Sequence, residues 1–381
     1  MQSSKRNMKN FIGKKILFFF PSNNKENEWQ YHHFINELQY IGIDFELFNP
    51  IIYGEYFESE LLNIIKLKRK EYSIFMTASY DGAISINTLL EIKKIGLPSV
   101  LICYDNLSIP FVHKITCKYY DVVWLTSIET EYLFKKWGAK TVFIPYAANP
   151  HIYKPMWGQV YKKNTVGFIG SMYGNRPNIL NKISLNKINT EVYTDLEKSI
   201  QNNQIPIKKY LKNIDHSLFY FKNLIRFPIG RKCIKGTFYK NFKNKDYFRL
   251  IRNEYLNIYP RVSFEEMIKL YSNFTITLNI IDLLDTFTLS KPITKVHLRI
   301  FEVPMCGGLQ ITRRSEEIQL YFEENKEILL YNSDEELIDK CKYYIGKDNI
   351  INTMKSNAYL RSIKEHTWEN RFIRLHRALY Q

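Results

Sequence analysis

The chain has 381 residues, 45% hydrophobic and 24% charged, which is the composition of a folded protein of about two domains and excludes disorder as its main state. Its five scattered cysteines contain no C-x-x-C pair, so they exclude a small disulfide-stapled fold, indicate no structural zinc and fit a reducing cytosol. The net charge of +16 favours an anionic partner such as nucleic acid, a membrane surface or a phosphorylated ligand, although general richness in lysine contributes to it.

The N-terminal segment carries basic residues between positions 5 and 15 and then a short apolar run, 16–20, that ends at Pro21. A membrane span needs about 20 apolar residues, and no small-residue cleavage site follows this run. The sequence therefore predicts neither a span nor a signal peptide. We expect a cytoplasmic protein, with peripheral attachment to the inner face of the membrane left open.

The first 145 residues alternate short, β-rich apolar runs with longer segments of helical spacing, such as 31–41 and 84–95. This alternation predicts βαβ units and an α/β fold with a parallel sheet covered on both faces. One helix is expected to begin at a capping box of Thr126 and Glu129 and to end at Gly138. The predicted strands are 15–20, 43–48, 73–77, 99–103, 122–126 and 141–144.

A proline- and glycine-rich linker at 145–158 precedes a second alternating series, and Ser333 with Glu336 predicts a helix that reaches about residue 345. We predict an N-terminal domain, 1–155, a C-terminal domain, 156–362, and a basic amphipathic C-terminal helix within 363–381. Two such domains predict a cleft between the carboxyl ends of their sheets, where open α/β sheets bind ligands. The predicted strands of the second series are 165–169, 190–193, 275–279, 309–312 and 327–331.

The stretch 205–252 differs from its surroundings because it holds 13 Lys or Arg against two acids, a charge of +11 in 48 residues. Ten aromatic residues are interspersed among these cations. Three interpretations stay open: an element that docks on an anionic membrane or acceptor, a nucleic-acid binding surface, or a solvated insertion.

The most informative stretch, TKVHLRIFEVPMCGGLQIT at 294–312, has the pattern of a helix ending at Gly307–Gly308 and followed by a buried strand. Arg299 and Glu302 are three residues apart, so they share one helical face. A carboxylate there can accept both hydroxyls of a ribose, and the guanidinium can hold a diphosphate. The alternative is a surface ion pair of little energetic weight.

This stretch is similar to the motif of GT-B glycosyltransferases, in which a Glu stands five residues before the glycine of a Cys-Gly turn, as Glu302 stands before Gly307. More narrowly, the chain resembles the CgeB-type family, named after a spore maturation protein. That family carries R-x-F-E before a Cys-Gly, matching 299–302 and 306–307, and a late His-Thr followed by Arg, matching His366, Thr367 and Arg371.

Two further phrases carry the resemblance: IPYAANPHIYKP at 144–155, which closes the family's N-terminal domain, and VGFIGS at 166–171, which opens its C-terminal domain. The resemblance covers roughly residues 72–374 and is absent between 195 and 255. In place of a second Glu eight residues before Glu302, which retaining enzymes carry, this chain has Thr294. The stereochemical outcome therefore stays open.

The resemblance implies a GT-B architecture: two Rossmann-like domains facing across a cleft, with a basic insertion in the C-terminal domain and a final helix that crosses back. It implies sugar transfer from a nucleotide-diphosphate sugar to a hydroxyl of a glycan, lipid-linked or protein acceptor, in cell-surface glycan or glycoconjugate synthesis. It implies no cofactor and no metal, because arginine and helix ends replace the cation.

The donor would lie on the C-terminal domain. The glycine turn Gly170–Ser171 after a strand lets backbone N–H groups approach a phosphate, assisted by Arg176, although many such turns hold a glycine for steric reasons. By resemblance, the backbone at Arg261–Val262 contacts the nucleobase, although Ser263 and Glu266 also predict a plain helix start. The expected donor-binding residues are Gly170, Ser171, Arg176, Arg261, Val262, Arg299, Glu302, Gly307 and Gly308.

The N-terminal domain would hold the acceptor and any general base, which takes the proton of the acceptor hydroxyl. The candidates follow predicted strands: Asp105 is the first choice, and Asp81 and His113 are the others. The alternative for each is an ordinary loop-capping role.

Three rival functions remain: a sugar-nucleotide epimerase, which needs no acceptor, a catalytically inert sugar-nucleotide binding module, and a nucleic-acid binding protein favoured by charge alone. The last predicts steeply salt-dependent binding.

Overall fold

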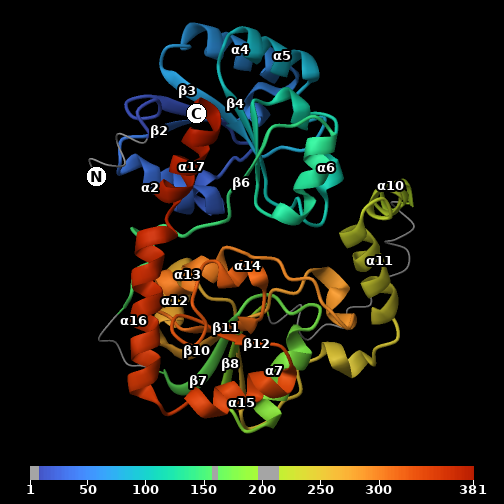
Figure 1. The fold of residues 1–381 in the computed structure, drawn as a ribbon, viewed down its shortest axis with the longest axis vertical. Helices are drawn as coiled ribbons and strands as arrows, with labels where there is room; N and C mark the ends of the chain where they lie inside the picture. Colours follow the sequence, from blue (N-terminus) through green and yellow to red (C-terminus); the bar gives the residue numbers. More distant parts are fainter. Residues whose placement is uncertain (1–7, 157–161, 196–213) are drawn as a thin grey trace. The chain divides into compact units, whose positions relative to one another are not determined.

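The computed structural model describes residues 8–156, 162–195 and 214–381 (Figure 1). The chain divides into two compact units, each with its own sheet. Unit 1 comprises Met1–Ile152 together with Glu365–Gln381, and unit 2 comprises Tyr153–Lys364.

Unit 1 is built on a six-stranded parallel sheet of order β2-β1-β3-β4-β5-β6. Each strand lies within two residues of its predicted bounds, and the four central strands of the sheet are almost wholly buried. The strands are β1 Lys15–Phe19, β2 Asp44–Phe48, β3 Tyr72–Thr77, β4 Ser99–Cys103, β5 Val122–Leu125 and β6 Thr141–Phe143. The main helices are α2 Asn36–Gln39, α3 Pro50–Tyr53, α4 Phe57–Leu67, α5 Ile86–Lys94, α6 Glu131–Lys136 and α17 Trp368–Tyr380.

The helix predicted over 31–41 forms, as a π-helical turn, Tyr31–Ile35, followed by the short α2. One local prediction in unit 1 is wrong. The capping box at Thr126 does not form, because the Thr126 hydroxyl donates to the carbonyl oxygens that end β4 and α6 begins only at Glu131. Gly138, with a positive φ of 87°, ends that helix as predicted.

The final helix, α17, packs on unit 1 through a buried guanidinium. Arg371 donates through Nε to the carbonyl oxygens of Pro145 and Tyr146, at 3.1 and 3.0 Å, and through Nη1 to that of Glu365. Each bond satisfies a backbone acceptor that would otherwise be costly to bury. The Arg that carries part of the family resemblance therefore fixes the chain where it leaves and re-enters unit 1.

Unit 2 has a second six-stranded parallel sheet, of order β12-β11-β10-β7-β8-β9. The sequence did not predict the edge strand β9 or the long helix α16. The strands are β7 Lys162–Ile169, β8 Thr190–Tyr193, β9 Leu256–Tyr259, β10 Phe274–Asn279, β11 Gln310–Arg313 and β12 Leu329–Tyr331. The helices around the sheet are α7 Arg176–Leu185, α12 Phe264–Asn273, α13 Arg299–Met305, α14 Glu316–Gln319, α15 Asp334–Tyr344 and α16 Asp348–Glu365.

Both predicted N-caps in unit 2 form: Ser263 accepts from the Glu266 N–H at the start of α12, and Ser333 accepts from the Glu336 N–H at the start of α15. The two parallel, helix-covered sheets confirm the predicted α/β fold class.

The described part of the basic stretch forms two helices, α10 Ile214–Leu224 and α11 Pro228–Lys240; residues 205–213 lie outside the described residues. Figure 1 shows the pair beside the helices that cover the sheet of unit 2. We call it the helical arm. It is attached where α11 meets Leu284–Thr288: a Cβ on Gly236 would lie 2.7 Å from the Asp285 carbonyl oxygen, and Lys240 forms a 3.0 Å ion pair with Asp285.

Glu37 on α2 gives unit 1 a pH-sensitive attachment for α17. Its buried carboxyl accepts from the backbone N–H groups of Trp368 and Glu369, at 3.1 and 2.7 Å, in the first turn of α17. Burial outweighs these two hydrogen bonds and raises the pKa of Glu37 from 4.5 to about 8. The folded protein therefore keeps a proton on Glu37 at pH values where the unfolded chain has lost it.

We expect the thermal midpoint of unit 1 to fall as pH rises from about 5 to 8, since folding then requires proton uptake by Glu37. The loss is at most about 1.4 kcal/mol per pH unit. Glu37→Gln keeps an acceptor oxygen but cannot titrate, so calorimetry across this range should show a shallower slope for the variant. Equal slopes for the two proteins would contradict the assignment.

Candidate functional site

Two arginine side chains converge on the turn that follows β7 in unit 2. A Cβ placed on Gly170 would lie 3.4 Å from Nη2 of Arg299, so the guanidinium lies directly against this glycine. Arg176, at the start of α7, donates from Nη1 to the Ser171 carbonyl oxygen at 2.8 Å. The structure thus brings together four of the residues predicted for donor binding, at the carboxyl edge of a parallel sheet, where such folds bind ligands.

Each guanidinium is held by a tyrosine. Nε of Arg299 donates to the Tyr271 hydroxyl at 3.1 Å, and Arg176 lies 3.8 Å above the ring of Tyr173 while donating to its hydroxyl at 2.7 Å. These contacts orient the planar groups without neutralising them, since a protonated tyrosine carries no charge.

The two arginines also lie close enough to repel one another. Burial, and secondarily the charge of Arg299, lowers the pKa of Arg176 to about 10. Burial alone would lower the pKa of Arg299 as well. The interactions with Tyr271 and Glu302 outweigh burial and raise the pKa of Arg299 above its usual value. Both groups are charged at neutral pH, so an anion bound beside them would relieve their repulsion and accept charge-assisted hydrogen bonds.

Glu302 lies one helical turn beyond Arg299 on α13 and is only 8% exposed. The Tyr153 hydroxyl donates to its Oε1 at 3.0 Å, and burial followed by the charge of Glu302 raises the pKa of Tyr153 far above its usual value. Tyr153 therefore stays protonated and fixes the carboxylate. No local pattern predicts this partner, which lies 149 residues earlier in the chain.

Gly307 and Gly308 are accounted for by turn geometry and packing. Gly307 has a positive φ of 70°, and a Cβ on Gly308 would lie 2.4 Å from the Tyr271 carbonyl oxygen. Both follow the C-terminus of α13, where the helix dipole disfavours an anion. They therefore give no physical support to the predicted contact with a diphosphate.

The predicted base-binding pair, Arg261 and Val262, follows β9 at the same edge of the sheet as Gly170, with Arg261 exposed and Val262 half-buried. The last residues of β8 and β9 are Tyr193 and Tyr259, whose rings stack at 4.8 Å with an interplanar angle of 20°. This aromatic pair was not among the predicted site residues, although a tyrosine at the end of a predicted strand is a signal that could have indicated it.

The three predicted general bases of unit 1 have different environments. Asp81 stabilises a loop. Its carboxylate accepts hydrogen bonds from the N–H groups of Ile115 and Thr116, both at 2.9 Å, and from the Thr116 hydroxyl at 2.6 Å. His113 is buried, which lowers its pKa to about 4 and keeps it neutral. Asp105 follows β4 and is half-exposed.

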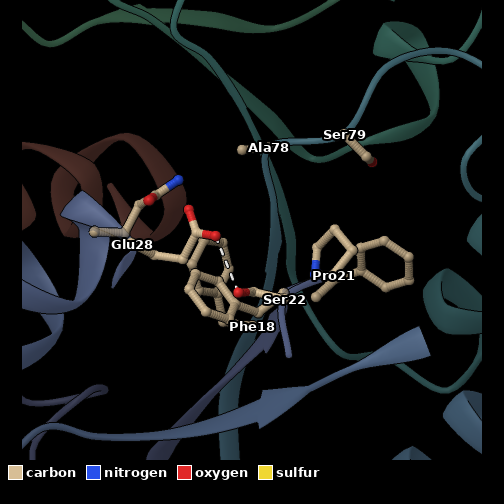
Figure 2. Close-up of a pocket in the computed structure, with 9 residues that line it drawn as sticks. Phe18, Pro21, Ser22, Glu28, Ala78 and Ser79 are labelled. Atoms are coloured by element: carbon tan, nitrogen blue, oxygen red, sulfur yellow. Dashed lines mark hydrogen bonds between the residues drawn. The ribbon is translucent and has the colours of Figure 1, made fainter. Parts of the chain in front are cut away.

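Unit 1 also contains a pocket that the sequence did not predict, with a volume of about 160 Å³. It lies beyond the ends of β1 and β3, and Figure 2 shows Glu28 hydrogen-bonded to Ser22 on one segment, with Ala78 and Ser79 on another. The lining residues are Phe18, Phe19, Phe20, Pro21, Ser22, Glu28, Gln30, Ala78 and Ser79.

Across residues 8–156, 162–195 and 214–381, no three His, Cys, Asp or Glu side chains are grouped as metal ligands. Over the same ranges, no helix has the length and apolar character needed to cross a bilayer.

Comparison with known proteins gives one family match. Residues 233–377, from α11 to α17, match the family model described as glycosyl transferase-like. A curated sequence, the phenolic acid decarboxylase PadC of Bacillus subtilis (strain 168), is 24% identical over 123 residues, which is 29% of this chain and 72% of PadC. That identity over so small a share assigns no family.

Solved glycosyltransferase structures match nearly the whole chain. A glycosyltransferase from Rickettsia africae is 14% identical with a TM-score of 0.56, covering 97% of this chain and 98% of its own. HepE of Anabaena, solved with UDP-glucose, is 12% identical with a TM-score of 0.55 and coverages of 94% and 98%. Sucrose-phosphate synthase of Thermosynechococcus elongatus is 11% identical with a TM-score of 0.54 and coverages of 96% and 97%. The chain therefore has the GT-B fold, and its residues 233–377 match a glycosyl transferase-like family model.

Proposed function

We propose that this protein transfers a sugar from a nucleotide-diphosphate sugar to an acceptor hydroxyl. The observation that carries the proposal is the convergence of Arg299 and Arg176 on the Gly170–Ser171 turn. Two fixed cations beside an open turn can bind a diphosphate, and the fold and the glycosyl transferase-like match make a sugar nucleotide the natural source of that group.

The chemistry follows from where charge develops. As the bond from the sugar to the diphosphate breaks, negative charge grows on the diphosphate, and preorganised guanidinium groups stabilise it without reorganising. Arg299 and Arg176, each held by a tyrosine, provide this preorganisation. Because they supply the positive charge, we propose that the reaction needs neither a cofactor nor a metal ion.

Glu302 is the proposed ribose ligand. Tyr153 fixes one of its oxygens, and a carboxylate held in this way can accept hydrogen bonds from the two ribose hydroxyls. Tyr259, which is 37% exposed and stacks on the buried Tyr193, offers a flat ring for the nucleobase near the backbone at Arg261–Val262. HepE was solved with UDP-glucose, so uridine is the first base to test.

In unit 1 we propose Asp105 as the general base, because the carboxylate of Asp81 is engaged and His113 is buried and neutral.

We further propose membership of the CgeB-type family, a cytoplasmic location and a role in cell-surface glycan or glycoconjugate synthesis. Arg371 of the late family motif binds backbone carbonyl groups of unit 1. This motif therefore supports the proposed fold and gives little information about the substrate.

The helical arm is proposed to contact an anionic membrane surface. Opposite the face that binds Asp285, α11 and the residues after it expose Phe238 and Phe242, at 58% and 73%, among exposed cations. Aromatic rings with cations between them suit the headgroup region of a bilayer, and such a location would suit a lipid-linked acceptor. The exposed cations of the described arm are Lys222, Arg226, Arg231, Lys232, Lys235 and Lys243.

The donor site is tested by a thermal-shift screen of the full chain against UDP, GDP, dTDP, CDP and ADP. A ligand at 100 times its dissociation constant stabilises by about 2.7 kcal/mol, or on the order of 2–4 °C. We expect one diphosphate to raise the midpoint, and Arg299→Ala and Glu302→Gln to lose the shift. Arg252→Ala, an exposed arginine in the same unit, is the control and should keep it.

No shift with any nucleotide would refute the proposed donor site. A shift that Arg299→Ala retains would move the site elsewhere. Binding without turnover in the presence of acceptors would favour an inert binding module, and conversion of the sugar nucleotide without an acceptor would favour an epimerase.

The membrane contact is tested by sedimentation with vesicles of phosphatidylcholine, with and without phosphatidylglycerol. We expect binding only to the anionic vesicles. The triple variant of Arg231, Lys232 and Lys235 to Gln should bind about 100-fold more weakly, since each cation contributes about 1 kcal/mol. A triple Gln variant of Lys66, Lys70 and Lys93, exposed in unit 1, removes the same charge and should bind normally.

Equal losses in the two triple variants would mean that net charge alone drives binding. Tight, salt-dependent binding to DNA or RNA in place of vesicles would favour the nucleic-acid alternative.

A further inference from the structure

The pocket of unit 1 occupies a position where parallel sheets bind ligands. Its residues lie at the end of β1 and in the segments that follow β1 and β3. These two strands are neighbours in the sheet, and their carboxyl ends form one edge. One side is the segment from Phe18 to Ser22 with Glu28 and Gln30, and the other is Ala78–Ser79 (Figure 2). All of these residues belong to unit 1, so the pocket is complete within one compact unit of the fold.

The lining selects the chemistry of the ligand. No Lys or Arg lies among the residues that line the pocket, and Glu28 would repel an anion, so neither a phosphate nor a carboxylate suits it. A carboxylate accepts hydrogen bonds, while serine hydroxyls and an amide both donate and accept them. Together with the apolar walls from Phe and Pro residues, these groups suit a ring that carries several neutral hydroxyls.

The size of the pocket limits the ligand further. Its volume of about 160 Å³ lies below the roughly 300–1,000 Å³ of pockets for drug-sized ligands. It can therefore hold a single ring and not a whole sugar nucleotide.

The carboxylate of Glu28 is positioned to accept a hydrogen bond from such a ring. Its Oε1 accepts from the Ser22 hydroxyl at 2.9 Å, and its backbone carbonyl accepts from the Tyr31 N–H at 3.1 Å, so both ends of the residue are fixed. Within the residues that the structure describes, its Oε2 has no hydrogen-bond or ion-pair partner and is available to a ligand.

The neighbouring loop connects this pocket to the proposed base. Trp29, next to Glu28 in the chain, packs edge-on against Tyr104 with ring centroids 4.8 Å apart, and Tyr104 precedes Asp105. In the sheet, β3 lies between β1 and β4, so the pocket and Asp105 lie at adjacent strand ends. A ring bound beside Glu28 is therefore near the residue that we propose as the base.

We infer that this pocket binds one hydroxyl-bearing pyranose ring of the acceptor and that Glu28 is its principal hydrogen-bond acceptor. The assignment of this ring to an acceptor rests on the proposed transfer reaction. Binding of the ring itself does not depend on that reaction.

The test is saturation-transfer NMR on the full chain with methyl glucoside, methyl galactoside and methyl mannoside as probes. We expect at least one pyranoside to receive magnetisation from the wild-type protein. Glu28→Gln, which replaces the charged acceptor by a neutral amide, should weaken its binding by roughly tenfold or more. Glu26→Gln is the matched control, since Glu26 is exposed on the same loop and outside the pocket, and it should bind like wild type.

A second readout separates this inference from the donor site. Glu28→Gln should keep the full thermal shift with the nucleotide diphosphate found for the wild type. Loss of both pyranoside and nucleotide binding in Glu28→Gln would show a structural role and overturn the inference. So would the absence of pyranoside binding in the wild type, or equal binding in wild type and Glu28→Gln. If no nucleotide binds the wild type but a pyranoside still depends on Glu28, the transfer reaction fails and the sugar pocket stands.

Discussion

The proposed chemistry of unit 2 depends on a half-buried guanidinium group packed against a glycine turn. Arg299 lies within van der Waals contact of the turn after β7 at Gly170, and it keeps its charge because Tyr271 and Glu302 compensate for desolvation. Partial burial of a charge is costly unless partners or a ligand satisfy it. The second cation, Arg176, increases this free-energy cost, and a bound anionic ligand would offset it.

The rest of unit 2 holds this arrangement in place. Parallel strands bring the ends of β7, β8, β9 and β10 to one edge, and α13 presents Arg299 and Glu302 on one face. Tyr153 belongs to unit 2 and reaches back to Glu302, so the carboxylate is fixed by the first residue of the unit rather than by its own helix. In unit 1, Arg371 stabilises the segment where the chain leaves that unit, because it donates hydrogen bonds to the backbone carbonyl groups there.

Most of the strands could be predicted from the sequence because they are short apolar runs, and the fold class followed from their alternation with helices. The edge strand β9 was missed because its four residues are interrupted by the polar Asn257, so no apolar run marks it. Among the site residues, Arg299, Arg176 and Gly170 were correctly placed near one another, since a helical face and a strand end determine their positions.

Other site assignments depended on contacts that no local pattern encodes. Asp81 was a candidate base until the structure showed it binding backbone N–H groups 34 and 35 residues later. Glu28 lies in a polar loop without periodicity, and its position in a pocket depends on β3 lying next to β1. Tyr153 was read as part of a linker, and its contact with Glu302 spans 149 residues.

The most direct test of the central claim is a crystal structure of the protein with a bound nucleoside diphosphate. The account predicts diphosphate oxygens within hydrogen-bond distance of Arg299 and Arg176, beside the Gly170–Ser171 turn, and ribose hydroxyls on Glu302. A diphosphate bound elsewhere on the chain, with both guanidinium groups unliganded, would contradict it.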